Sequence, residues 1–169
     1  MQPDQHESQR VIDLMLVVDE SSFENEGMCK AYLFTSVDRV IEGNGTVNLA
    51  LAANPGDVLR ISTTSISNQF NAAVFAYGVV HRGGDETVDG ERSEQRVIHS
   101  LGVVQHPGLV NHEPPLVSFE ERPFHVLELT VSDHGRQELH LNVAIYDLQG
   151  ARDEGSARQE VVDVALAIS

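Results

Sequence analysis

Residues 43–77 read GNGTVNLALAANPGDVLRISTTSISNQFNAAVFAY, and this stretch determines the expected fold class. Apolar side chains alternate with polar or small ones over 47–51 and again over 59–62, which is the period of a half-buried β-strand. Asn54-Pro55-Gly56-Asp57 lies between the two segments and predicts a β-turn. The stretch therefore predicts consecutive strands joined by tight turns.

The two ends of this stretch carry further signals. Asn44-Gly45 predicts a tight hairpin turn with positive φ angles, which would pair Val40-Ile41 with Thr46-Val47. Residues 73–80 are apolar on both faces and are interrupted by Gly78. We expect a central strand there, with a bulge or a close packing approach at the glycine.

The same alternation recurs on both sides of 43–77. It predicts strands over 11–18, 31–35, 37–41, 97–104, 127–131, 139–145 and 162–168. The polar segment 82–92 and the proline-rich segment 105–115 are expected to be loops. Repeated strands separated by turns, with no long amphipathic helix, predict an all-β protein built as a two-sheet antiparallel β-sandwich.

The length of 169 residues suits one domain of this class. The polar residues 1–10 are expected to form a flexible N-terminal arm, and residues 11–169 a single β-sandwich domain. The apolar side chains expected to share one core are Leu49, Leu51, Leu59, Ile61, Phe75, Leu127, Leu129, Leu141, Val143 and Ile145.

Composition excludes several classes of partner. The chain has 26 acidic and 11 basic residues, which gives a formal net charge of -15. Such a charge repels phosphate backbones and anionic membrane surfaces, so we expect no nucleic acid partner. No apolar run approaches the length of a transmembrane helix, so we expect no membrane insertion.

The cysteine content and the N-terminus bear on the cellular compartment. Cys29 is the one cysteine, so no intramolecular disulfide can form and no cysteine-rich metal site exists. The N-terminal residues MQPDQHESQR lack the basic region and apolar run of a Sec signal peptide. We therefore expect a soluble cytoplasmic protein, with export without a leader left open.

Acidic side chains concentrate in the segment RGGDETVDGER at 82–92. Asp85, Glu86 and Asp89 supply the carboxylate oxygens that Ca²⁺ prefers, although the spacing is not that of an EF-hand. These residues are the candidate metal ligands, and a solvated hairpin tip is the alternative interpretation.

Clustered hydroxyl and amide groups surround Phe70 in the segment 65–71. Asn68, Gln69 and Asn71 could hold saccharide hydroxyls, and turn capping is the alternative. No nucleophile elbow, metal-binding histidine pair or phosphate-binding glycine loop is present, so we expect no catalytic residues and no enzyme activity.

The segment 43–77 also resembles the core motif of the AidA/PixA family of bacterial inclusion-body proteins. The matching residues are Gly43, Gly45, Thr46, Leu49, Gly56, Asp57, Ser65, Ser67, Asn68, Ala73, Val74 and Tyr77. Weaker similarities cover 124–148 and 12–19. The chain departs from the family pattern in having no tryptophan and in carrying ESSFENEGMCK where an Asn-Pro-Thr-rich segment is expected.

The resemblance implies a jelly-roll-like sandwich and a non-enzymatic protein that accumulates or self-assembles. It also implies a link to quorum-regulated or host-associated bacterial physiology. A carbohydrate-binding, lectin-like sandwich, with Ca²⁺ as a candidate cofactor, is the alternative function.

A self-contact is expected from apolar residues left over once the core is filled. Val11, Met15 and Val17 form one such group on the first strand, and the strand 162–168 forms the other. Exposed apolar strands recruit further strands, so we expect a homodimer or higher oligomer that uses one or both terminal strands.

Overall fold

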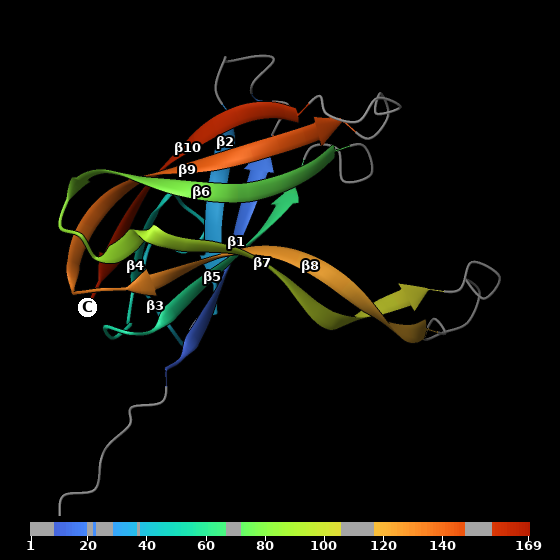
Figure 1. Ribbon diagram of the computed structural model, residues 1–169, viewed down its shortest axis with the longest axis horizontal. Helices are drawn as coiled ribbons and strands as arrows, with labels where there is room; N and C mark the ends of the chain where they lie inside the picture. Colours follow the sequence, from blue (N-terminus) through green and yellow to red (C-terminus); the bar gives the residue numbers. More distant parts are fainter. Residues whose placement is uncertain are drawn as a thin grey trace, which may run out of the picture.

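The computed structural model describes residues 9–19, 22, 29–36, 38–66, 72–105, 117–147 and 157–169. These residues form ten strands in two five-stranded sheets (Figure 1). The first sheet has the order β2-β1-β5-β8-β7 and contains β1 (Val11–Asp19), β2 (Lys30–Thr35), β5 (Val58–Ser65), β7 (Val88–Gln105) and β8 (Val117–Val131). The second sheet has the order β3-β4-β10-β9-β6 and contains β3 (Val40–Glu42), β4 (Asn48–Leu51), β6 (Ala72–Gly84), β9 (Gly135–Asp147) and β10 (Ala157–Ile168).

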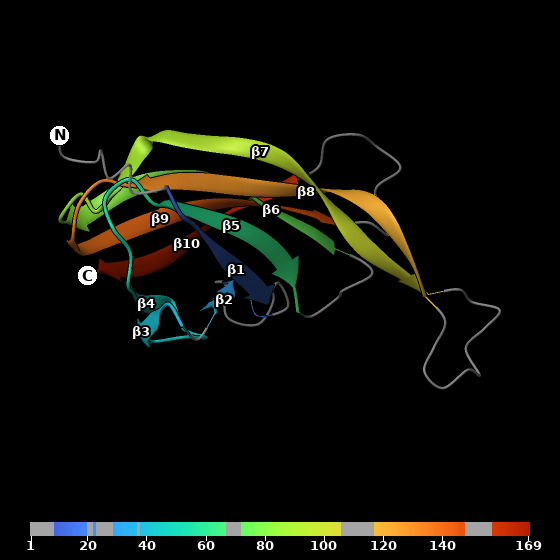
Figure 2. The same ribbon diagram turned by 90° about the horizontal axis from the view of Figure 1, so that it is seen from below.

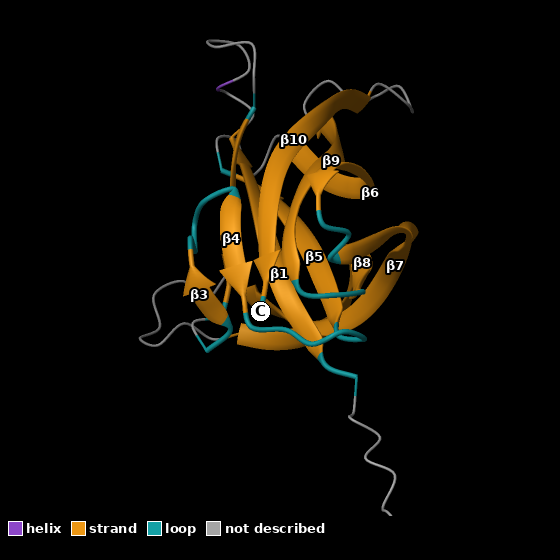
Figure 3. Cartoon of the chain, turned by 90° about the vertical axis from the view of Figure 1, so that its left-hand side faces the viewer, coloured by secondary structure: helices purple, strands orange, loops and turns teal. Residues whose placement is uncertain are grey.

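The predicted all-β sandwich is confirmed, and its core lies between the two sheets (Figure 3). Alternate residues of each strand point inward, as Ile12, Leu14, Leu16 and Val18 do on β1. The predicted core is correct except at Phe75, which is half-buried while its neighbours Val74 and Ala76 face the core. The segment 73–80 is apolar throughout, so its pattern could not indicate which face is buried.

The sheets are not wholly antiparallel, which corrects one part of the prediction. Most neighbouring strands run antiparallel, but β1 lies parallel to β5 and β4 lies parallel to β10. Local alternation identifies strands without ordering them, so it could not show these two parallel pairs. Each sheet thus departs from a strict antiparallel jelly roll at one step.

The glycine turn before β4 has the predicted positive φ at Gly45 but not at Asn44, and its pairing also differs. Gly45 has a φ of 80°, and Thr46 N–H donates to Gly43 O at 3.0 Å, closing a β-turn. Val40 nevertheless lies opposite Leu51, so the predicted pairing of Val40-Ile41 with Thr46-Val47 is wrong. The turn docks on β2 instead, because Gly45 N–H donates to Leu33 O at 2.7 Å.

Two strand assignments also need correction. The predicted loop at 82–92 is mostly strand, since β6 continues to Gly84 and β7 begins at Val88. β6 has the expected bulge near Gly78, but it lies at the edge of the second sheet rather than at its centre.

The terminal strands are internal, which removes strand-edge pairing as a basis for the predicted self-contact. β10 lies between β4 and β9, and its residues Val162, Val164, Leu166 and Ile168 are buried in the core. β1 lies between β2 and β5, with Val11 and Met15 exposed on the outer face. Neither strand offers a free edge, and the predicted contact through the exposed Val11 and Met15 stays a prediction.

Residues 1–8 lie outside the described part of the chain, so the division into an N-terminal arm and one domain stays a prediction. Within the described residues, no helix has the length and apolar character needed to cross a membrane.

Candidate functional site

The most distinctive surface is a two-stranded hairpin that extends beyond the sandwich. β5 pairs with β8 only as far as Ser62 opposite Val126, and past that point β7 is the one described strand that pairs with β8. The ladder continues from Val97 opposite His125 to Gln105 opposite Val117. We call residues 96–105 and 117–125 the projecting hairpin, and Figures 1 and 2 show it leaving the body of the molecule.

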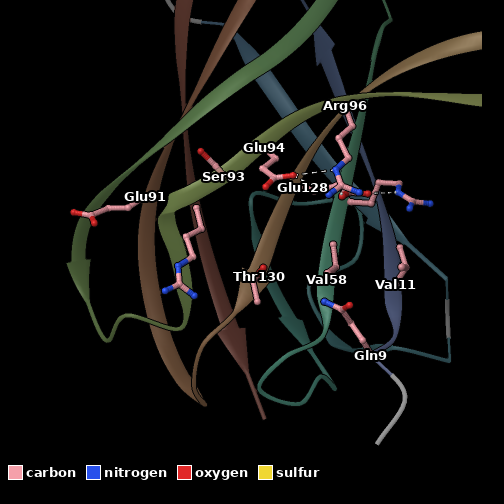
Figure 4. Close-up of a pocket in the computed structure, with 11 residues that line it drawn as sticks. Gln9, Val11, Val58, Glu91, Ser93, Glu94, Arg96, Glu128 and Thr130 are labelled. Carbon is pink, nitrogen blue, oxygen red and sulfur yellow. Dashed lines mark hydrogen bonds and ion pairs between the residues drawn. The ribbon is translucent and has the colours of Figure 1, made fainter. Parts of the chain in front are cut away.

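An ion cluster fixes the base of the projecting hairpin on the outer face of the first sheet (Figure 4). The side chain of Glu128 is only 11% exposed, and its Oε1 accepts a hydrogen bond from Arg60 Nε at 2.9 Å. Its Oε2 lies 3.1 Å from Arg96 Nε. Because Arg60 belongs to β5 and Arg96 to β7, one carboxylate on β8 ties three adjacent strands together.

Arg96 also contacts Glu94, whose Oε2 accepts from its Nη2 at 2.8 Å. This hydrogen bond, followed by the charges of Glu128 and Glu94, raises the pKa of the Arg96 guanidinium above its ordinary value. The cluster borders an open groove of about 540 Å³. Since its charged groups contact one another, the cluster serves to hold the strands in place.

A second set of contacts holds the base on the opposite face. Gln95 Nε2 donates to the carbonyl oxygen of Tyr77 on β6 at 2.8 Å. The His125 ring meets Phe75 edge to face, with ring centroids 5.4 Å apart, and Phe75 meets Tyr146 in the same way at 5.7 Å. These rings, with Tyr77 and Gln159, line an uncharged groove of about 440 Å³. The projecting hairpin is therefore anchored on both faces.

Beyond its base, the projecting hairpin exposes large apolar side chains. Val97 is 59% exposed, Leu101 70% and Phe119 67%. Their positions in the ladder put all three on one face, the face that continues the sandwich core. Phe124 is also exposed, on the other face. A soluble monomer seldom leaves such a patch uncovered.

The projecting hairpin is electrically neutral on a strongly acidic chain. It contains two arginines and two glutamates, Arg96, Arg122, Glu120 and Glu121, so its formal charge is +2 − 2 = 0. The net charge of -15 therefore belongs to the rest of the chain. Two copies of the protein repel each other least where these hairpins meet.

The predicted saccharide ligands Asn68, Gln69 and Asn71 lie outside the described residues. Of the predicted calcium ligands, Asp85 accepts a hydrogen bond from Arg136 N–H at 3.0 Å, and Asp89 accepts from the N–H groups of Glu91 and Arg92, each at 3.1 Å. Glu86 contributes its carbonyl oxygen, which accepts from the Ser132 hydroxyl at 2.6 Å.

Asp85 and Asp89 thus use their carboxylate oxygens to shape the chain around the β6–β7 connection. No three potential metal-ligating side chains gather anywhere in the described residues. A calcium site at Asp85, Glu86 and Asp89 stays a prediction, without geometric support from this arrangement.

Sequence reasoning identified a strand at 97–104 but missed the projecting hairpin. Its one signal was the uncharged run VIHSLGVVQ at 97–105, next to a proline-rich segment. The alternation within a strand does not reveal whether the neighbouring strands of its sheet extend as far as the strand itself.

Comparison with known proteins identifies close parallels in sequence pattern and fold. The family model described as PixA, inclusion body protein, matches residues 27–158. A crystal structure of an inclusion body protein of the PixA group from Burkholderia cenocepacia J2315 superposes with a TM-score of 0.68, at 15% sequence identity and with 100% of both chains covered. At that identity the likeness concerns the fold alone. No curated protein matches the sequence.

Proposed function

Because the chain belongs to the PixA family of inclusion body proteins, we propose that it assembles with copies of itself into dense protein deposits in the cytoplasm and catalyses no reaction. The observation that carries this proposal is the projecting hairpin, which exposes Val97, Leu101 and Phe119 on one face and has a formal charge of zero. The link to quorum-regulated or host-associated physiology that the AidA/PixA resemblance implies stays a prediction.

Burial of the exposed apolar face supplies the driving force for assembly. Removing a side chain such as Leu101 or Phe119 from water contributes roughly 1.5–3 kcal/mol. Contact also stabilises the projecting hairpin itself, since an isolated two-stranded ribbon is at best marginally stable in water. The anchored base limits the orientations of the hairpin, so less entropy is lost when it docks.

The acidic residues outside the projecting hairpin, which we call the acidic body, oppose this assembly through charge repulsion. Copies that approach through other surfaces meet the repulsion of a chain with net charge -15. Contact through neutral hairpins keeps the acidic bodies apart, and salt or a lower pH weakens the remaining repulsion. Assembly should therefore depend on concentration and on ionic conditions together.

The test is a pair of double variants compared by light scattering across the micromolar range. Leu101→Ser/Phe119→Ser removes the apolar face of the projecting hairpin, and we expect it to form no large assemblies at concentrations where the wild-type chain forms them. Val11→Ser/Met15→Ser is the matched control, because these residues are also apolar and exposed but lie on the outer face of β1. Large assemblies of the first variant at wild-type concentrations would contradict the proposal, as would a wild-type chain that remains monomeric.

We also propose saccharide binding as a second candidate function, favoured by the uncharged groove beside the base of the hairpin. Phe75, Tyr77 and Tyr146 supply aromatic surface, and Gln159 supplies amide groups, which together suit the apolar faces and hydroxyls of a neutral sugar. A glycan array with and without a chelator tests this function and the role of calcium. Binding that survives Tyr146→Ala would rule out this groove, and loss of binding in Asn68→Ala/Asn71→Ala would place the ligand at the predicted loop.

A further inference from the structure

The two long edges of the projecting hairpin, one on β7 and one on β8, differ in the backbone N–H groups available to pair with another strand. Along β8, Val131 N–H donates to Asp57 O at 2.8 Å, and Val131 O accepts from Gly56 N–H at 2.8 Å. Val131 thus turns its backbone groups toward β5, and Ser132 N–H points the other way, to Thr87 O. In an antiparallel strand the backbone N–H and C=O groups of successive residues point to opposite sides. Every second residue counted back from Val131, including Pro123, therefore points its backbone groups away from β7.

Pro123 fits this position because it has no N–H to offer the ladder. It stands directly opposite His99, and the two form a pair whose backbone groups point away from each other. The N–H and C=O of His99 therefore face the free edge of β7. Val97 and Leu101 have the same orientation, since they lie two residues away on either side.

Proteins protect exposed strand edges with proline and charged residues. The free edge of β8 has this protection, with Pro123 preceded by Glu121 and Arg122. The free edge of β7 lacks it, because 97–105 reads VIHSLGVVQ, with no proline and no Asp, Glu, Lys or Arg. In the described part of the chain, β7 is the last strand of its sheet.

We propose that two copies of the chain join through the free edges of β7 over 97–105, antiparallel and related by a two-fold axis. This inference rests on the proposed self-assembly and names its first contact. The two first sheets, of five strands each, become one continuous ten-stranded sheet. A two-fold contact of this kind uses the same edge on both copies and closes on itself.

Charge placement favours the antiparallel arrangement. Glu94 and Arg96 lie at the base of the projecting hairpin, and the strand beyond them is uncharged. Antiparallel pairing places each base beside the uncharged outer part of the partner strand, whereas parallel pairing places Arg96 beside Arg96 and Glu94 beside Glu94. Like charges directly opposite each other destabilise a strand pair.

Edge pairing also explains how growth continues past the dimer. Once both β7 edges are paired, the apolar faces that contain Val97, Leu101 and Phe119 lie side by side on one enlarged sheet. That surface is free to stack on another dimer. The edge therefore specifies the dimer, and the apolar face extends it into a deposit.

The first experiment compares proline variants by sedimentation velocity. His99→Pro removes an N–H from the free edge of β7 and leaves the β7–β8 bonds in place, so we expect dimerisation to weaken at least about tenfold. His99→Ala controls for loss of the imidazole, and Glu121→Pro places the same proline on the opposite edge. Both controls should dimerise like the wild-type chain.

Cysteine cross-linking tests the pairing independently of any proline effect on folding. In a Cys29→Ser background, single cysteines are placed at each position from 97 to 103 and oxidised. Antiparallel two-fold pairing predicts disulfide-linked dimers at one or two neighbouring positions only. Each residue further from the two-fold axis adds about 6.6 Å to the distance between that residue and the same residue of the partner copy, which soon exceeds the reach of a disulfide.

The outcomes separate this inference from the proposed function. Cross-linking at every position, or at none, would overturn antiparallel edge pairing. Antiparallel edge pairing would also be overturned if the wild-type chain dimerises and the His99→Pro variant dimerises equally well. A wild-type chain that never assembles would instead contradict the self-assembly on which the inference rests.

Discussion

Arg60 Nε lies 2.9 Å from Glu128 Oε1, and this contact joins β5 to β8 two residues before their pairing ends. The carboxylate is largely withdrawn from solvent, with Arg96 on its other side. Two guanidinium groups offset the cost of burying one carboxylate, and the pairing holds β7 and β8 where they leave the sandwich. Loss of the carboxylate should therefore affect both stability and the projecting hairpin.

Glu128→Ala should lower the free energy of unfolding by about 1–3 kcal/mol, because it leaves the partly buried Arg60 without its main acceptor and takes one ion-pair partner from the exposed Arg96. Glu121→Ala removes a carboxylate that is exposed on the projecting hairpin and should change stability by no more than about 0.5 kcal/mol. Urea unfolding measures both values. Equal effects would show that the Glu128 cluster contributes no more than a surface ion pair.

Leu141 tests the core directly, because it is 1% exposed and lies between the two sheets. Leu141→Ala should cost about 2–5 kcal/mol through lost burial and a residual cavity. Val161→Ala is the control, since Val161 lies on β10 but is exposed. A negligible loss at Leu141 would mean that the two sheets do not pack as described.

Gly43 and Gly56 separate two costs of replacing a turn glycine. Both have positive φ angles, 81° and 94°, so alanine is strained at either position. A Cβ on Gly43 would lie 1.8 Å from the carbonyl oxygen of Asn48, whereas a Cβ on Gly56 would meet nothing within 4 Å. Gly43→Ala should therefore lower the melting temperature clearly more than Gly56→Ala, and an equal loss would disprove the predicted clash.

The sequence predicted those parts of the fold in which a strand buries one face only. On β1, inward leucine, isoleucine and valine alternate with residues that face outward, so strand and core face both followed from the period. The period gave no answer at Phe75, because the whole segment is apolar. It also gave none for the neighbours of β1 and β10, because strand order depends on contacts between segments far apart in the chain.

The candidate site was harder to predict for a related reason. The run at 97–105 was recognisable as a strand, but its projection from the body depends on where β5 stops pairing with β8, at Ser62 opposite Val126. The opposition of His99 and Pro123 depends on the register of β7 against β8. Neither fact can be read from residues 97–105 alone. That this strand has a free edge is evident only from the pairing of the whole sheet.

Acidification should promote assembly. As the pH falls toward the sequence pI of about 4.7, carboxylates take up protons and the net charge of -15 shrinks toward zero, so repulsion between the acidic bodies declines. Turbidity of the wild-type chain should therefore rise between neutral pH and pH 5. Salt should act in the same direction at neutral pH, because the Debye length falls to about 10 Å at 0.1 M.

The double variant Leu101→Ser/Phe119→Ser distinguishes specific assembly from simple isoelectric precipitation. It keeps every charge of the wild-type chain and loses only the apolar face, so we expect it to stay clear at a pH where the wild-type chain scatters light. Equal turbidity of the two chains would mean that loss of charge alone causes the association. Turbidity that changes with neither pH nor salt would mean that the acidic body does not oppose assembly at all.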